Sequence, residues 1–117
     1  MESSVSFKQL IETLAKKGCI EILLLLKESP KRWSMIEHYI KDKKSVSYRL
    51  KELLNLGLIK VVIIHDTPTG SKAYELTPLG KKIVQHIEEM EKEFEGYHSH
   101  LPEGAGFIDK ILEGDKN

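Results

Sequence analysis

The chain has 117 residues, enough for one domain with a modest core, and its 18 basic and 18 acidic side chains give a formal net charge of zero. No apolar run approaches the ~20 residues of a membrane span, and the N-terminus lacks the pattern of a secretory signal, so neither is expected. The single cysteine excludes a disulfide within the chain and suits a reducing compartment, so the expected location is cytoplasmic.

The charges are unevenly distributed along the chain. Residues 27–52 hold eight Lys and Arg against four acids, a net charge of +4, whereas residues 88–117 hold three lysines against nine acids, −6. Such a chain can present a basic face to phosphate although it is neutral overall; the alternative is an ordinary solvated set of surface charges. The 16 Lys and 14 Glu, against two Arg and four Asp, are typical of thermophilic proteins, and an AT-rich genome gives similar Lys usage.

The first two predicted helices differ in their apolar pattern. Residues 6–17 place apolar side chains at i, i+3, i+4 and i+7, which predicts an amphipathic helix. Gly18 is expected to break it. Residues 19–28 are apolar on more than one face, so we expect this second helix to lie at the centre of the domain.

Two further helices follow, separated by a short turn. Ser34-x-x-Glu37 has the form of a capping box and predicts a helix that starts at Ser34 and packs through Ile36, Tyr39 and Ile40. Residues 42–44 are the expected turn, and residues 45–55 the next helix. Its apolar positions fall on one face, while small, hydrogen-bonding or basic groups fall on the other. Gly57 is expected to end this helix in a left-handed conformation.

A β-hairpin is predicted directly after that helix. Residues 58–65 are rich in Val and Ile, residues 67–71 are dense in turn-forming types, and residues 73–76 can pair back as the second strand. Thr77 then suits a helix N-cap, with Pro78 at the first helical position, where its missing N–H is not needed. A helix followed at once by a hairpin is the outline of a DNA-binding winged helix, an α+β and mainly helical fold.

The helix after Thr77 is longer than one small domain needs. Its apolar residues follow steps of four, four, three, four and three, as a heptad seam does. We predict that this helix, residues 78–97, forms a homodimer, with residues 6–17 of either subunit as a further packing partner; the alternative is a surface helix folded back on its own core. The residues expected at the dimer interface are Ile83, Ile87, Met90 and Phe94. Residues 98–117 are predicted as a tail with a short final helix or docked segment.

The residues from Arg32 to Gly80 carry a resemblance to a known group of proteins. The run from Ser45 to Leu58 is similar to the recognition helix, and its exit, of winged helix-turn-helix repressors of the HxlR, ArsR and MarR types. Pro68, Tyr74, Leu76-Thr77 and Gly80 resemble the HxlR-like wing and the start of the following helix, and Arg32-Trp33-Ser34 resembles that group's entry into the motif. The similarity covers roughly residues 18–95, within one expected winged-helix domain over residues 1–117 with its core at 19–77.

The resemblance implies a sequence-specific regulator of transcription, a homodimeric repressor that binds double-stranded DNA. The recognition helix would enter the major groove, with Ser45, Ser47 and Tyr48 as candidates for base edges. The candidates for phosphate contacts are Lys43, Lys44, Arg49 and Lys51, with Lys72 on the wing. The alternatives are a winged helix used for protein–protein contact and a nonspecific architectural DNA binder; any small-molecule effector stays unknown.

No other chemistry is expected of the chain. It has no Gly-rich phosphate loop, nucleophile elbow or H-E-x-x-H motif, so an enzyme is not expected. His86 and Glu89 lie one turn apart, but no cysteine between residues 34 and 56 supplies the thiolate pair of the ArsR-like metal site, and no metal or cofactor is expected. Cys19 falls inside an apolar helix, where a thiol is usually inert; the alternative is a redox switch.

Overall fold

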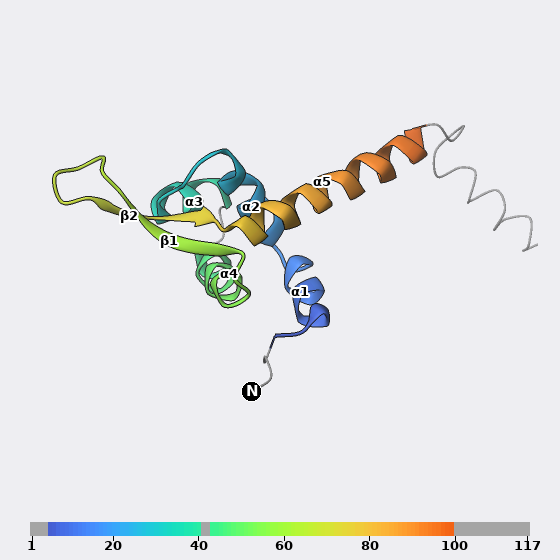
Figure 1. The fold of residues 1–117 in the computed structure, drawn as a ribbon, viewed down its shortest axis with the longest axis horizontal. Helices are drawn as coiled ribbons and strands as arrows, with labels where there is room; N and C mark the ends of the chain where they lie inside the picture. The colour runs from blue at the N-terminus through green and yellow to red at the C-terminus, as the bar shows by residue number, and fades with distance from the viewer. Residues whose placement is uncertain (1–4, 41–42, 100–117) are drawn as a thin grey trace, which may run out of the picture. The chain divides into compact units, whose positions relative to one another are not determined.

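The computed structural model describes residues 5–40 and 43–99. Contacts divide the chain into two compact units, residues 1–84 and residues 85–117. The elements in chain order are α1 (Phe7–Leu14), α2 (Cys19–Glu28), α3 (Trp33–Ile40), α4 (Lys43–Asn55), β1 (Ile59–Ile64), β2 (Ser71–Leu76) and α5 (Pro78–Ser99) (Figure 1). In the described ranges no helix is long and apolar enough to cross a membrane. The predicted segment after residue 99 lies outside the described residues.

The core of the first unit is built around α2. Cys19, Ile22 and Leu23 are fully buried and Leu26 is nearly so, which confirms the central position predicted from apolar residues on more than one face. Side chains of α3, α4 and β2 complete the core: Ile36, Val46, Leu50, Leu53, Ala73 and Leu76. Burying each large aliphatic side chain stabilises the fold by roughly 1.5–3 kcal/mol.

The predicted start of α3 is wrong by one residue. The helix begins at Trp33, and the carbonyl of Arg32 accepts the backbone N–H groups of Met35 (3.0 Å) and Ile36 (3.1 Å), so Ser34 lies inside the helix instead of capping it. The reason lies one residue upstream, where Lys31 is paired with β2 and sets the point at which the chain turns into the helix. The expected apolar face is also incomplete, because Tyr39 is 60% exposed.

Helix α4 is longer than predicted at its start and ends where predicted. It begins at Lys43, so Lys43 and Lys44 belong to the helix and not to the turn. At its end Gly57 has φ +78°, and the N–H groups of Gly57 and Leu58 donate to the carbonyls of Leu54 and Leu53, each at 3.0 Å. This is a Schellman motif, and it confirms the predicted left-handed glycine.

The hairpin is a two-stranded antiparallel sheet. Ile59 lies opposite Leu76 and Ile64 opposite Ser71, so β2 begins two residues earlier than predicted. Lys31 adds a short third partner to the sheet: its N–H donates to the carbonyl of Tyr74 (3.0 Å), and the N–H of Tyr74 donates back to the carbonyl of Lys31 (2.9 Å). The base of the wing is therefore fixed to the segment that enters α3.

Thr77 joins the recognition helix, the wing and α5. Its hydroxyl accepts the N–H of Gly80 at 2.9 Å, which confirms the predicted N-cap, and donates to the carbonyl of Gly57 at 2.6 Å. Its own N–H donates to the carbonyl of Leu58 at 3.0 Å. Gly80 packs directly on this carbonyl, and a Cβ added at Gly80 would overlap the Leu58 oxygen.

Gly80→Ala should therefore destabilise the first unit. The added methyl group meets backbone atoms, which cannot move aside as a flexible side chain can. Overpacking typically costs about 1–3 kcal/mol, and we expect a loss of unfolding free energy near the upper end of this range. Urea unfolding followed by circular dichroism measures the change. Gly96→Ala is the matched control in the same helix, since nothing lies within 4 Å of its added Cβ and alanine is the better helix former. Equal stability of the two variants would contradict the close approach.

Candidate nucleic-acid interface

Helix α4 has one buried and one exposed face. Val46 and Leu53 are fully buried and Leu50 nearly so, while Tyr48 on the other face is 62% exposed. Ser45 and Ser47 are partly exposed, and Lys44 and Lys51 are exposed. Lys43 is the first residue of the helix. The exposed face thus combines one aromatic ring, two hydroxyl groups and basic side chains, a set suited to base edges and phosphates.

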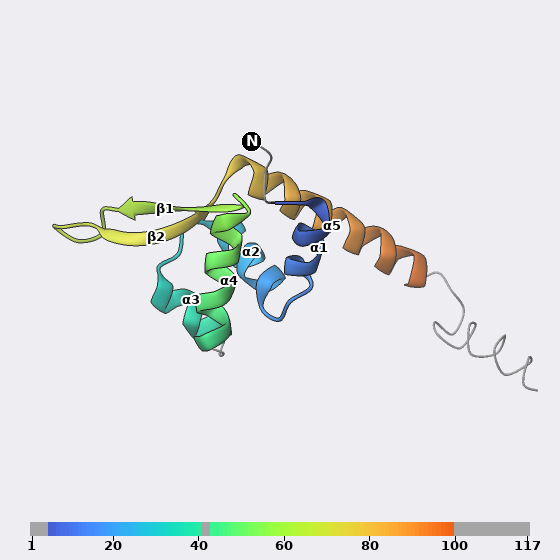
Figure 2. The same cartoon turned by 90° about the horizontal axis from the view of Figure 1, so that it is seen from below.

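The wing carries two exposed lysines, Lys60 on β1, which is paired with Glu75 at 3.5 Å, and Lys72 on β2. Lys72 lies on β2 opposite Ile63 of β1, and its Nζ lies 5.6 Å from the centroid of the Tyr74 ring. The ring is nearly buried, so it holds the aliphatic stem of the lysine against the sheet while the ammonium group stays in solvent. In both views α3, α4 and the base of the wing lie at one end of the first unit, and α1 lies at the other (Figures 1 and 2).

Arg49 differs from the other predicted phosphate contacts. Its side chain is only 15% exposed, and its Nε lies 2.7 Å from Oε1 of Glu52. The second carboxylate oxygen, Oε2, accepts a hydrogen bond from Nζ of Lys16 at 2.6 Å. Glu52 therefore ties the recognition helix to the segment between α1 and α2. The i, i+3 spacing of Arg49 and Glu52 permitted this pair, but the Lys16 partner, 36 residues away, could not be found from sequence.

The network also sets the pKa of Glu52. Burial by itself raises this pKa, but the hydrogen bond from Lys16 and the positive charges of Arg49 and Lys16 together outweigh it and hold the pKa below its ordinary value. The carboxylate is therefore ionised in the folded protein at neutral pH. A carboxyl group with a lowered folded-state pKa stabilises the fold above its unfolded-state pKa of about 4.3, and this contribution is lost as the pH falls through the folded-state value.

Glu52→Gln should consequently lower the free energy of unfolding at pH 7, by on the order of 1 kcal/mol because the group is partly exposed. The amide keeps the shape of the side chain but not its charge, so the difference from wild type should shrink as the pH is lowered below about 4. Urea unfolding of both proteins at several pH values checks this. Glu12→Gln, on α1 and exposed, is the control; a difference independent of pH would contradict the ionic role of Glu52.

Arg32 is a basic residue near this face that the sequence did not single out as a contact. It immediately precedes α3 and is about half exposed, and its Nη1 lies 3.1 Å from Oδ2 of Asp66 at the end of β1. Oδ1 of Asp66 accepts a hydrogen bond from the hydroxyl of Ser71 at 2.7 Å. The sequence shows that Arg32 lies at the entry to the motif. It does not show that Arg32 lies close to the wing, because this depends on how the hairpin folds.

Cys19 is fully buried in the core. Burial raises the pKa of its thiol to about 11, and the nearby positive charge of Arg49 offsets this only in part. The thiol is therefore protonated at neutral pH, and the thiolate is the reactive form. This environment favours the interpretation of Cys19 as a small core residue over that of a redox switch.

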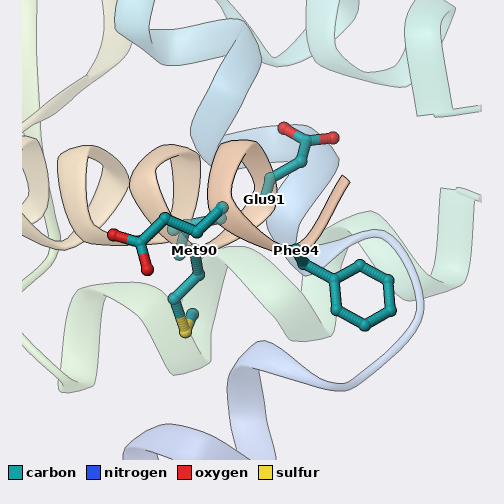
Figure 3. Close-up of a pocket in the computed structure, with 5 residues that line it drawn as sticks. Met90, Glu91 and Phe94 are labelled. Carbon is teal, nitrogen blue, oxygen red and sulfur yellow. The ribbon is translucent and has the colours of Figure 1, made fainter. Parts of the chain in front are cut away.

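The second unit presents apolar side chains on α5. Met90 and Phe94 are about two-thirds exposed, and they line one surface of the helix together with Glu91 (Figure 3). Ile87 is partly buried and lines the same surface. In the first unit, Ile83 lies with Leu10, Leu58 and Leu79 along an apolar groove beside α1. The residues predicted at the dimer interface therefore lie on helix surfaces that expose large apolar side chains.

Comparison with known proteins identifies the family. The family model described as HxlR-like helix-turn-helix matches residues 13–101. The chain belongs to this family. Its members are transcriptional regulators that bind DNA through the helix-turn-helix and are not enzymes, and the α+β winged-helix fold predicted from the sequence is confirmed.

Solved structures show the same fold. The reduced form of the transcriptional regulator YodB from B. subtilis is 26% identical with a TM-score of 0.64, over 78% of this chain and 89% of that one. The diamide-treated form of YodB is 25% identical with a TM-score of 0.57, over 76% and 91%. A mutant of ZitR from Lactococcus lactis in its apo form is 23% identical with a TM-score of 0.60, over 93% and 86%. No curated protein sequence matches the chain.

Proposed function

We propose that this HxlR-like regulator is a homodimeric repressor that recognises a specific sequence of double-stranded DNA. The observation that carries the proposal is the exposed face of α4, where Tyr48 stands between exposed lysines on a helix whose other face is locked into the core. A helix held in this way can enter the major groove as a rigid reader. We place this regulator in the cytoplasm, because a DNA-binding protein acts in the compartment that holds the DNA and a single reduced cysteine suits a reducing compartment.

Two kinds of contact divide the proposed interface. Ser45, Ser47 and Tyr48 are the proposed readers of base edges, since a hydroxyl can bond to a base and an aromatic ring can contact a thymine methyl group. The proposed phosphate contacts are Lys43, Lys44, Lys51 and Lys72. Arg49 is better suited to hold α4 in place, because its guanidinium is already paired with Glu52 and is largely buried.

Substitutions at the two kinds of contact should differ in kind as well as size. Tyr48→Ala should lose on the order of 1–3 kcal/mol on the preferred DNA and relax the preference at a defined base pair, with little change on scrambled DNA. Lys51→Ala and Lys72→Ala should weaken all sequences alike and lower the slope of log K against log salt by roughly one unit each.

These effects are measured with a duplex selected from a random library by the purified protein, and with a scrambled duplex of the same composition. Glu12→Ala, on the exposed side of α1, is the control and should change neither affinity nor slope. Equal effects of Tyr48→Ala on both duplexes would favour a nonspecific architectural role. Failure of the wild type to bind either duplex would favour a protein-binding winged helix, for which the neutral net charge is the supporting observation.

The proposed dimer rests on the apolar surface of α5. Met90 and Phe94 are each about two-thirds exposed, and covering them would release roughly 1.5–3 kcal/mol per side chain. In a two-fold dimer the same surface of both subunits is used, so every favourable contact occurs twice. A dimer would also present two recognition helices to two DNA half-sites, which is how helix-turn-helix proteins gain affinity.

Ile87→Glu combined with Met90→Glu should therefore produce a monomer that binds the selected duplex far more weakly. Light scattering at micromolar protein concentration gives the oligomeric state, and circular dichroism shows whether the helix content is retained. Glu89→Lys, at an exposed position of α5 that does not line this surface, is the matched control and should remain dimeric. A wild-type protein that is already monomeric under these conditions would refute the dimer.

A further inference from the structure

Arg32 joins the entry to α3 to the loop of the wing, because its ion-pair partner Asp66 follows the end of β1. The ion pair of its Nη1 with Oδ2 of Asp66 spans 3.1 Å, and Asp66 is itself held by the hydroxyl of Ser71 at 2.7 Å. The preceding residue, Lys31, makes two backbone hydrogen bonds with Tyr74 of β2. The backbone therefore fixes where Arg32 lies relative to the wing, and the Asp66 carboxylate fixes the direction of its guanidinium group.

The Arg32–Asp66 ion pair is better suited to orient the guanidinium group than to stabilise the fold. The side chains of Arg32 and Asp66 are 48% and 36% exposed, and ion pairs at such exposure contribute little to folding because water screens them. A guanidinium group carries five N–H donors in a planar fork, and the ion pair joins one of its nitrogens to one carboxylate oxygen. Within the described residues Asp66 is the only charged side chain paired with it, so donors remain for a second anion.

The position of Arg32 is one that a DNA strand would pass. Arg32 immediately precedes α3, one of the helices that lie with α4 and the wing at one end of the first unit (Figure 2), and its ion pair places it beside the loop of the wing. In helix-turn-helix proteins the first helix of the motif crosses the sugar–phosphate backbone while the second enters the major groove. A strand that runs from the groove read by α4 toward the wing would cross the junction that Arg32 and Asp66 form.

The surroundings of the pair fit a sugar–phosphate backbone. Arg32 and Asp66 line a cleft together with Met35, Tyr39 and Ile64. Met35 is 42% and Tyr39 60% exposed, so both offer apolar surface beside the guanidinium group. A phosphate needs charged, forked donors, whereas a deoxyribose ring needs apolar contact, and the cleft supplies both.

We propose that Arg32 binds a backbone phosphate of DNA and that Asp66 is the positioning residue that orients its guanidinium group for this contact. The inference deepens the proposed DNA-binding function and rests on it. It adds a fixed contact between the recognition helix and the wing, whose strands carry two exposed lysines, Lys60 and Lys72. Arginine suits this place better than lysine because the planar fork can hold a carboxylate and a phosphate at once.

The test measures affinity against salt concentration for the selected and the scrambled duplex. Arg32→Ala should weaken both by the same factor, about tenfold at low salt, and lower the slope of log K against log salt by roughly one unit. Arg32→Gln should show the same loss of slope, which keeps the test valid if the alanine variant folds poorly. Arg32→Lys should keep the slope and recover only part of the affinity. Lys8→Ala, an exposed lysine on α1, is the control that should change nothing.

Asp66→Asn tests the positioning role separately. The amide keeps the size of the side chain and can still accept the hydrogen bond from Ser71, but it loses the charge that orients Arg32. Binding should weaken with an unchanged salt slope, and the same substitution should have no effect once Arg32 is alanine. Tighter binding of Asp66→Asn in both backgrounds would show that the carboxylate only repels phosphate and would overturn its positioning role.

The failure of this inference can be told apart from the failure of the function on which it rests. If wild-type protein binds neither duplex at any salt concentration, the proposed DNA-binding function is refuted. If wild-type protein binds with a steep salt dependence while Arg32→Ala and Arg32→Gln keep both slope and affinity, only the Arg32 contact is refuted.

Discussion

The whole first unit depends on the junction at Thr77. There the end of α4, the start of β1, the end of β2 and the start of α5 are joined by four hydrogen bonds of Thr77 and by the contact of Gly80 with the Leu58 carbonyl. Each hydrogen bond contributes only about 1 kcal/mol, but together they fix the direction of four elements within a few residues. A recognition helix can present the same side chains to every DNA molecule only if its end and the base of its wing cannot rotate against each other.

Charge is used in two different ways on this scaffold. Lys16 and Arg49 both pair with Glu52, and these contacts hold α4 against the segment between α1 and α2. Outside, Lys44, Lys51 and Lys72 stay exposed and can release counterions from DNA. A net charge of zero is therefore no obstacle to binding, because the acids that balance these lysines lie elsewhere in the sequence, nine of them after residue 87.

Local pattern predicted the elements and missed the contacts between distant ones. The apolar face of α4, Gly57 at its end and the Thr77 cap were predictable because each depends on residues within one or two turns of chain. The start of α3 was not predictable in this way, because it is set by the bridge between Lys31 and Tyr74, two residues far apart in the sequence. Arg49 was placed with the phosphate contacts for the same reason: its basic type and position on the recognition helix are local facts, whereas its burial depends on how Glu52 and Lys16 meet.

The exposed apolar side chains of α5 and α1 favour association with a partner that covers them. A single subunit leaves Met90 and Phe94 on α5 largely in water, and Phe7 on α1 is 74% exposed, whereas a soluble chain usually keeps rings of this size partly covered. In the sequence, both helices lie outside the helix-turn-helix segment formed by α3 and α4. Association through these helices would set the spacing of two recognition helices, and anything that altered their packing would change DNA affinity without touching the residues that read bases.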